Sequence, residues 1–142
     1  MQARNAVETD IGVLWGRDCV FLDRISMPDT STLCLQVSIN ANIVRDFRAP
    51  DGWSKTDEIP YVFMFQRCLG YQVLELDTWD SQNDDTNAFL DSSFQELVNS
   101  KWLASLAGKR GQSHRHFQLA TYDEVFDIIC VDYRLSFGND VG

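Results

Sequence analysis

The sequence predicts an α+β domain, in which a mostly antiparallel, twisted sheet of about six to eight strands carries one principal helix, at about 91–107. Three patterns indicate this fold class: an alternating run at 33–44, an amphipathic stretch at 91–107 and a final hairpin at 116–137. A chain of 142 residues can bury one core, so we expect residues 1–142 to form a single α+β domain, with 1–9 as a loose N-terminal leader.

The first strands are expected around two short turns. Apolar runs at 11–15 and 19–22 flank the turn sequence at 16–18, and a second turn is expected at 27–30. From Leu33 to Val44 apolar and polar residues then alternate. A period of two over a dozen residues predicts a strand with one buried face and one wet face, an arrangement that antiparallel sheets permit.

The middle of the chain is expected to contain two more strands between two polar loops. A long surface loop is predicted at 45–60, and strands are predicted at 61–65 and 71–77. The strand at 61–65 is apolar on both faces, which is typical of a central strand. The polar, acidic stretch at 78–87 is interpreted as a loop.

The principal helix is predicted from its start and stop signals. Ser93 and Glu96 have the spacing of a capping box, and Gly108 is a suitable C-terminal stop. The apolar residues between these signals fall on one broad arc at helical spacing. The hairpin that follows is expected to run over 116–122, turn at Asp123-Glu124 and return over 125–137.

The composition limits the kind of partner. The chain carries 12 Lys and Arg against 21 Asp and Glu, a net charge of −9. Nucleic acids and anionic membranes both attract clustered positive charge, so we expect neither as a partner. No export signal is visible, and no apolar window reaches the ~18 residues that cross a bilayer, so a cytoplasmic location is expected. Four buried, reduced thiols are expected at Cys19, Cys34, Cys68 and Cys130.

No motif in the sequence predicts catalysis, a cofactor or a metal. There is no phosphate-binding loop and no nucleophile elbow, so no catalytic residue and no cofactor are expected. A serine or cysteine triad would have to use His114 or His116, the two histidines of the chain. These two could share a strand face and bind a metal together with Asp123. Without a marked third ligand, two surface histidines are the preferred interpretation.

The distribution of charge indicates a surface for a basic protein. Residues 72–142 hold −7 of the net charge, and residues 75–96 contain seven acidic residues and no basic one. An acidic face can steer a basic partner, and aromatic residues inside a charged rim are common at protein interfaces. The predicted partner-binding residues are Asp77, Trp79, Asp80, Asp84 and Asp85. An ordinary solubilising surface is the alternative interpretation of the same residues.

Two other functions are compatible with the sequence. A small anionic ligand or substrate could bind near the loop at 45–60, held by Arg45, Arg48 and Trp53. Alternatively the chain could be a structural protein that forms a homodimer, through the strand at 61–65 or through Leu103 on the predicted helix.

The segment from Ile59-Pro60-Tyr61 to Asp77-Thr78-Trp79, His116-Phe117 and the stretch at 122–127 together carry a resemblance. They resemble small acidic bacterial proteins that are mostly uncharacterised, some of which are immunity partners in contact-dependent or polymorphic toxin systems. The resemblance implies a stand-alone cytoplasmic protein that binds rather than catalyses. Our expectation is therefore a non-enzymatic binding protein, an immunity-type inhibitor whose acidic surface covers a basic toxin.

Overall fold

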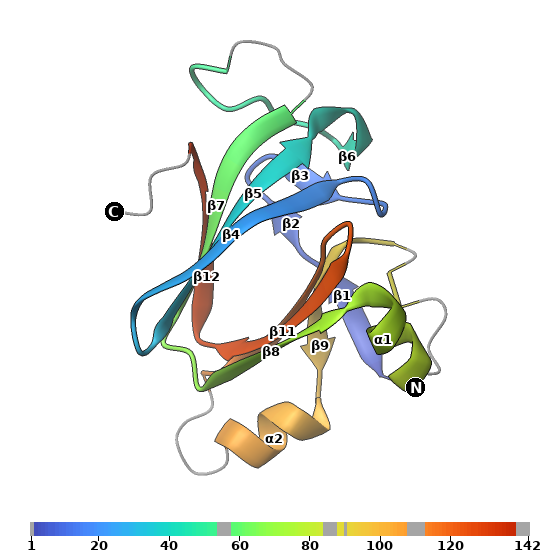
Figure 1. Ribbon diagram of the computed structural model, residues 1–142, viewed down its shortest axis with the longest axis vertical. Coiled ribbons are helices and arrows are strands. Elements are labelled where there is room, and N and C mark those ends of the chain that lie inside the picture. Colours follow the sequence, from blue (N-terminus) through green and yellow to red (C-terminus); the bar gives the residue numbers. More distant parts are fainter. Residues whose placement is uncertain (1, 54–57, 84–87, 90, 108–112, 139–142) are drawn as a thin grey trace.

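The computed structural model describes residues 2–53, 58–83, 88–89, 91–107 and 113–138, and these form three sheets and two short helices (Figure 1). The five-stranded sheet has the order β1 (Ala3–Ala6), β9 (Phe94–Val98), β10 (Arg115–Ala120), β11 (Glu124–Cys130) and β8 (Gly70–Glu75). The four-stranded sheet has the order β12 (Asp132–Phe137), β7 (Glu58–Gln66), β5 (Thr32–Asn40) and β4 (Val20–Asp29). The three-stranded sheet has the order β2 (Glu8–Thr9), β3 (Gly12–Leu14) and β6 (Val44–Arg45).

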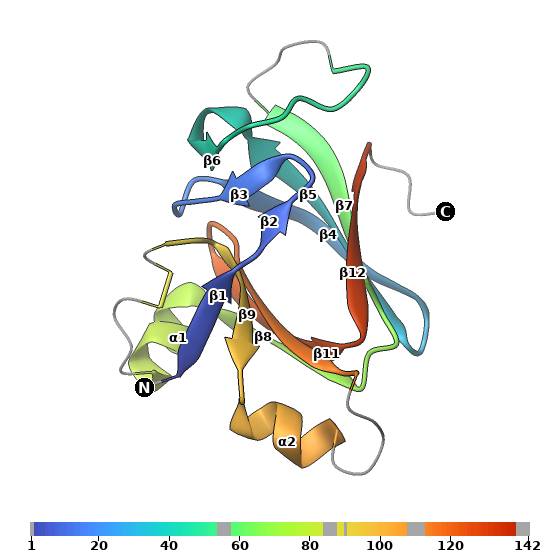
Figure 2. The ribbon, with the colours of Figure 1, turned by 180° about the vertical axis from the view of Figure 1, so that it is seen from behind.

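The two larger sheets face each other across the core and meet at a shared corner (Figures 1 and 2). The chain passes between them twice there, from β7 to β8 and from β11 to β12. The amide of Val131 donates to the carbonyl of Gln66 at 3.0 Å, and the amide of Leu69 donates to that of Ile129 at 2.9 Å. These hydrogen bonds satisfy the backbone where strand pairing changes from one sheet to the other.

The core is built around aromatic rings from both sheets. Phe94 on β9 lies with its ring centroid 5.2 Å from Phe63, 5.5 Å from Phe117 and 4.9 Å from Tyr133. Phe65 completes the group, at 6.2 Å from Phe94. The four phenylalanines are fully buried. Aromatic contacts of this kind add to the stabilisation from burial, so this cluster fixes how the two sheets pack.

The α+β prediction with one principal helix is wrong. Twelve strands in three sheets replace the expected six to eight in one, and only two α-helices occur among the described residues, each of seven residues. Of the predicted helix at 91–107, Phe94–Val98 is an inner strand of the five-stranded sheet and only Lys101–Ala107 is helical (α2).

The serines explain why the predicted helix does not form at its first half. The amide of Ser93 donates to the carbonyl of Leu14 at 2.9 Å, and its hydroxyl donates to the carbonyl of Gly16 at 2.8 Å. Ser92 likewise donates its hydroxyl to the carbonyl of Phe94. These side chains tie the segment to its neighbours instead of forming the capping box with Glu96. Tertiary packing of Phe94 overrides the local helical pattern.

A second correction concerns the acidic stretch at 78–87, which was expected to be a loop. Its first part belongs to helix α1 (Leu76–Gln82), and residues 84–87 lie outside the described residues. The predicted strand at 71–77 ends at Glu75 as β8. The side chain of Glu75 accepts hydrogen bonds from the amides of Asp77 and Thr78, at 3.1 Å each, which starts the helix there.

Other predicted elements are confirmed. Every strand pairing that the structure describes is antiparallel, the alternating run forms β5, and the apolar stretch at 61–65 lies in β7, an inner strand. The final hairpin forms as β10 and β11, but the chain then leaves that sheet at Val131 and continues as β12 in the four-stranded one. The strand β5 ends in a short 3-10 turn (Ala41–Ile43) where the side chain of Asn40 accepts from the amide of Asn42.

Two further expectations concern the burial of the four cysteines and the length of the helices. All four cysteines are free; three are buried as predicted, whereas Cys68 is only half-buried. Burial raises the pKa of Cys19 to about 11, so this thiol stays protonated at neutral pH. Neither helix in the described part of the chain is long and apolar enough to cross a membrane.

Replacing Phe94 with alanine tests the packing of the core. We expect Phe94→Ala to lower the free energy of unfolding by about 3–5 kcal/mol, because it removes a buried ring that contacts both sheets. Val98→Ala is the matched control, because Val98 lies on the same strand and is 37% exposed; it should cost less than about 1 kcal/mol. Urea denaturation of both variants measures the difference, and equal losses would contradict this description of the core.

Candidate ligand site on the outer face of the five-stranded sheet

The outer face of the five-stranded sheet carries a row of polar side chains that face away from the core. In this row Gln95, Gln118, Asp127 and Gln72 are cross-strand partners on β9, β10, β11 and β8. We call these four residues the polar row. Their neighbours along each strand, such as Phe117, point into the core. Because side chains alternate along a strand, the packing of the core directs the polar row outward.

A second row lies one pairing step away on the same face. Arg4 on β1, Leu97 on β9 and His116 on β10 are cross-strand partners. The two rows place His116 diagonally next to Asp127, and Arg4 diagonally next to Gln95. Most of these polar side chains are buried despite facing outward: His116 is 4%, Gln118 3% and Asp127 8% exposed. Buried polar groups need hydrogen-bond partners, and here they provide them for one another.

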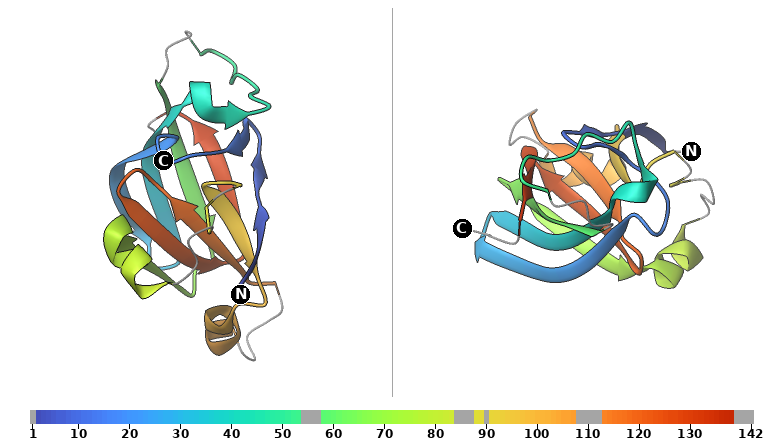
Figure 3. Two further views of the ribbon diagram at one scale, coloured as in Figure 1. Left: turned by 90° about the vertical axis from the view of Figure 1, so that its right-hand side faces the viewer. Right: turned by 90° about the horizontal axis from the view of Figure 1, so that it is seen from above.

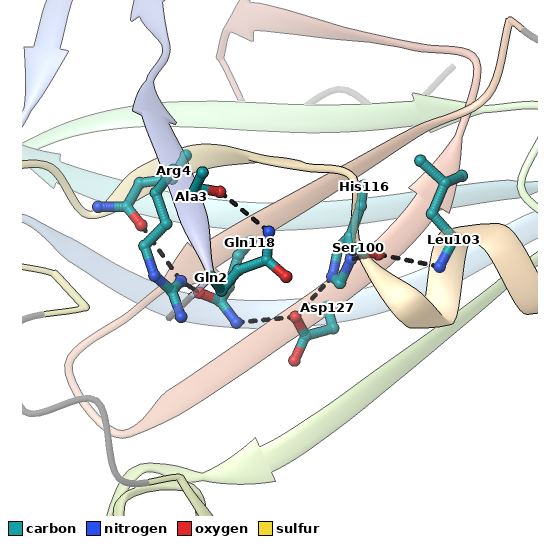
Figure 4. Close-up of polar contacts among 9 residues, drawn as sticks. Gln2, Ala3, Arg4, Ser100, Leu103, His116, Gln118 and Asp127 are labelled. Atoms are coloured by element: carbon teal, nitrogen blue, oxygen red, sulfur yellow. Dashed lines mark hydrogen bonds and ion pairs between the residues drawn. The ribbon is translucent and has the colours of Figure 1, made fainter.

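Hydrogen bonds join the two rows into one network, most of which Figure 4 shows. The Oδ1 atom of Asp127 lies 2.7 Å from Nε2 of His116 and accepts from Nε2 of Gln118 at 2.8 Å. The guanidinium of Arg4 donates to the side-chain oxygens of Gln118 and Gln95. The network therefore runs across the sheet from Arg4 to His116.

Asp127 keeps one oxygen free of this network. Both of its hydrogen bonds within the described residues are made by Oδ1, and Oδ2 points away from His116 and Gln118 (Figure 4). Asp127 also lines a cavity of about 330 Å³ on this face of the sheet. A buried carboxylate oxygen of this kind is a strong acceptor for a ligand that enters the cavity.

The two helices lie outside the sheets (Figure 3), and both contribute walls to this cavity, which we call the outer groove. Helix α1 contributes Trp79, Gln82 and Asn83, and α2 contributes Trp102, while the polar row supplies Gln72, Gln118 and Asp127. The groove therefore has two indole side chains beside a polar floor, a combination that is typical of small-molecule sites.

Helix α1 is held in place by its cap and by one buried tryptophan. Trp79 is 3% exposed and packs against Phe89, with ring centroids 5.2 Å apart. It belongs to a small cluster on the outer side of the sheet that includes Ala120 and Val125. The side-chain amide (Nδ2) of Asn83 donates to the carbonyl of Trp79 at 2.8 Å, which secures the end of the helix.

Helix α2 is held by Ser100 and by two aromatic contacts. The hydroxyl of Ser100 accepts from the amide of Leu103 at 2.9 Å, as an N-terminal cap does, and lies 2.7 Å from Nδ1 of His116. The indole of Trp102 meets the imidazole of His116 edge-on, with centroids 5.6 Å apart. Gly70 on β8 lies beneath the helix, where a Cβ atom would approach Leu106 to 3.5 Å.

The predicted partner-binding residues fall around α1, but not all of them are on its surface. Asp77 and Asp80 are exposed on the helix, and Asp84 and Asp85 lie outside the described residues. Trp79 was predicted as an aromatic anchor for a protein partner; in the structure its ring is buried and forms a wall of the outer groove. Trp79 is therefore part of the packing between α1 and the sheet rather than an exposed aromatic residue.

Each of the three residues predicted to bind an anionic ligand, Arg45, Arg48 and Trp53, contacts another part of the chain. The guanidinium of Arg45 lies 4.5 Å from the ring centroid of Trp15, and Trp53 packs edge-on against Phe47. Arg48 donates to the backbone carbonyls of residues 9 and 10 at 2.8 and 3.0 Å. Each arginine is thus engaged in contacts within the chain, and Arg48 fastens the turn between β2 and β3.

The sequence analysis missed the network around Asp127 and His116. It considered His114 and His116 as a pair, but His116 is engaged with Ser100 and Asp127. Among the residues that the structure describes there is no group of three or more histidine, cysteine or acidic side chains placed to hold a metal ion. In the sequence, the network is visible only as polar residues that alternate with core residues on two consecutive strands. Such a pattern normally indicates a strand face that is exposed to solvent.

The chain matches no protein-family model, no curated protein and no solved structure.

The cap of α1 makes the groove wall sensitive to acid. Hydrogen bonds from the amides of Asp77 and Thr78 lower the pKa of Glu75 below its usual 4.5. Because the folded-state pKa is depressed, the stabilisation is present above 4.5 and is lost as the pH falls through the folded-state value. We expect the backbone amide NMR signals of Asp77 and Thr78 to move in that acidic range.

Glu75→Gln is the control for this prediction, because a glutamine oxygen can accept the same bonds but does not titrate. In this variant the two amide signals should stay in place over the same range. If they move as in the original chain, another group is responsible for the effect.

Proposed function

We propose that the chain binds a small uncharged ligand with several hydroxyl groups, such as a sugar unit, in the outer groove. The observation that carries this proposal is Asp127, a buried carboxylate whose Oδ1 is occupied by His116 and Gln118 and whose Oδ2 remains open at the groove. A hydroxyl group can donate to Oδ2 and accept from a neighbouring amide at the same time.

The charges in the groove support an uncharged ligand. Arg4 and Asp127 both line it and are linked through Gln118, so their opposite charges offset each other locally. Arg4 would attract an anion that Asp127 repels, and Asp127 would attract a cation that Arg4 repels. The volume of about 330 Å³ lies at the small end of the range for ligand pockets, which suits one or two sugar rings.

The two tryptophans support the same ligand class. Trp79, which is 3% exposed, and Trp102, which is half-buried, line the groove from the two helices next to hydrogen-bonding groups. The C–H face of a sugar ring can pack on an indole while its hydroxyl groups reach the polar row. A purely apolar ligand would leave Asp127 without a partner, which is unfavourable for a buried carboxylate.

Calorimetric titration with glucose, N-acetylglucosamine and cellobiose tests this proposal. We expect binding of at least one of them, and a loss of about tenfold or more in affinity for Asp127→Asn, because a hydrogen bond to a charged acceptor is worth about 1.5–3 kcal/mol. Gln72→Ala, at the exposed end of the polar row, should weaken binding without disturbing the buried network.

Asp80→Asn is the matched control, because Asp80 is exposed on α1 and is not among the groove-lining residues. It should bind like the original chain. Circular dichroism shows whether each variant is folded. Absence of heat with all three sugars, or equal affinity of folded Asp127→Asn, would contradict the proposal.

The surface of α1 favours a second function, in which a basic protein is the partner. Glu75 at the N-terminal cap of this helix and Asp77 and Asp80 within it are exposed, and the chain as a whole carries a net charge of −9. An acidic helix on a strongly acidic protein accelerates association with a basic surface. These residues support the proposal of a cytoplasmic, immunity-type inhibitor that covers a basic toxin.

Charge reversal on α1 tests this second proposal. The probe is a purified toxin domain from any toxin gene found next to the gene of this chain, and its association rate is measured by biolayer interferometry. We expect the rate to fall several-fold as salt rises, and to fall at fixed salt for the double variant Asp77→Lys/Asp80→Lys.

The double variant Asp10→Lys/Asp51→Lys changes the net charge equally at exposed positions around a different hollow. It should slow association less than the α1 variant does. Equal slowing would mean that total charge, and not the α1 surface, controls the rate.

A further inference from the structure

We propose that Ser100 is a nucleophile that accepts an acyl group from a carboxylic ester, with His116 as its general base and Asp127 as the residue that orients His116. The three side chains come from different parts of the fold: the start of α2, β10 and β11. The hydroxyl of Ser100 lies 2.7 Å from Nδ1 of His116, and Nε2 of His116 lies 2.7 Å from Oδ1 of Asp127 (Figure 4).

The direction of the hydrogen bonds favours base catalysis. Asp127 lies between two donors at Oδ1, one of which is the amide of Gln118, so it acts as an acceptor there. The proton of a neutral imidazole then resides on Nε2, and the lone pair of Nδ1 faces Ser100. Ser100 accepts from the amide of Leu103, so its own proton is directed at Nδ1. A serine hydroxyl aligned on the free lone pair of an oriented histidine is the arrangement that activates nucleophiles.

A helix cap alone does not need this arrangement. A capping serine requires only an acceptor for an amide, and water can take its proton. Here the proton is instead directed at an imidazole held on its far side by a buried carboxylate. The ring nitrogens are used in the opposite sense from the serine proteases, in which Nε2 faces the serine, but the roles of the three groups correspond.

Ser100 is only 3% exposed, but it is among the lining residues of a second cavity, which adjoins the outer groove. This cavity has a volume of about 660 Å³, and its lining includes Ser100, His116, Lys101 and Trp102. We call it the α2 hollow. Its size is sufficient for an ester, and Lys101 on its lining contributes a positive charge, which would stabilise a carbonyl oxygen that becomes negative. The backbone just before the serine is also unusual, since Asn99 has φ of 55°, a conformation that non-glycine residues rarely adopt.

The proposed reaction is ester hydrolysis in two steps. Ser100 Oγ forms a bond to the carbonyl carbon while its proton moves to Nδ1 of His116. The bond from that carbon to the alkoxy oxygen then breaks, and the departing oxygen takes the proton, which releases an alcohol. Water next gives a proton to Nδ1 and adds to the acyl carbon; the carboxylic acid leaves, and the proton returns to Ser100 Oγ.

This inference is independent of the sugar proposal, because it concerns the α2 hollow and requires no ligand in the outer groove. Both cavities are lined by Gln2, Leu97, Trp102 and His116, whereas Ser100 is among the lining residues of the hollow and not of the groove. Because sugar binding and labelling of Ser100 are measured separately, failure of one proposal leaves the other standing.

Covalent labelling provides the test. The full chain is incubated with a fluorophosphonate and, separately, with p-nitrophenyl acetate, and the modified peptide is located by mass spectrometry. We expect the label on Ser100, with release of p-nitrophenol at a rate above that of buffer. Ser105 is the internal control, because it lies on the same helix and is exposed, and its hydroxyl donates to the carbonyl of Trp102. It should remain unlabelled, and Ser105→Ala should behave like the original chain.

Two variants separate catalysis from helix capping. Ser100→Asn keeps an oxygen that can cap α2 but removes the nucleophile, so labelling and hydrolysis should both disappear in a folded protein. His116→Gln keeps Ser100 but removes the base, and it should slow labelling about a hundredfold. An unlabelled Ser100 in the folded original chain would overturn the proposal. So would labelling that is undiminished in folded His116→Gln, or hydrolysis that survives in Ser100→Asn.

Discussion

The register of β9, β10 and β11 is the constraint on which the rest of the structure depends. Phe94 on β9 packs against Phe63 of the opposite sheet and against Phe117 on β10. These contacts fix which side chains of each strand face the core and which face outward. A shift of one residue in any of these strands would bring the polar row into the core and expose the phenylalanines. The aromatic core therefore determines that Gln118 and Asp127 face outward together.

The helices turn this outward face into a site. On an uncovered sheet, residues such as Asp127 would be hydrated and equivalent to any polar surface. Helices α1 and α2, with only seven residues each, enclose the face from two sides and place Trp79 and Trp102 against it. Helices this short are not stable alone, so each depends on a cap and on tertiary contacts. The cap of α1 is Glu75 and that of α2 is Ser100. The cavity walls are consequently among the parts of the fold that open most easily.

The sequence predicted the strands better than the helices, and the reason is physical. Alternation at 33–44 and the apolar stretch at 61–65 follow from burial of one or both faces, which local patterns record directly. The segment at 93–98 carries a pattern compatible with both helix and strand, and contacts of Ser93 with residues 14 and 16, distant in sequence, decide between them. Helix α1 was missed because its cap is a glutamate at the end of a strand, and not one of the usual capping residues.

The site was less predictable than the fold, because its main property is burial. His116, Gln118 and Asp127 occupy positions where a polar residue normally faces water, and no local pattern distinguishes a wet position from one that a helix covers. Trp79 was singled out as an exposed anchor for the same reason: the sequence shows a tryptophan in an acidic stretch but not which way its ring points. In the structure that ring is buried against Phe89, and whether Trp79 belongs to a functional region stays a prediction.

Asp127 links the two proposed sites energetically. Its Oδ1 fixes the orientation of His116 for Ser100, and its Oδ2 is the acceptor offered to a ligand in the outer groove. The carboxylate shares one negative charge between the two oxygens, so a donor bound at Oδ2 draws charge away from Oδ1. Such a donor would weaken the hydrogen bond between Asp127 and the imidazole. One buried carboxylate thus contributes to both proposed sites, through a different oxygen at each.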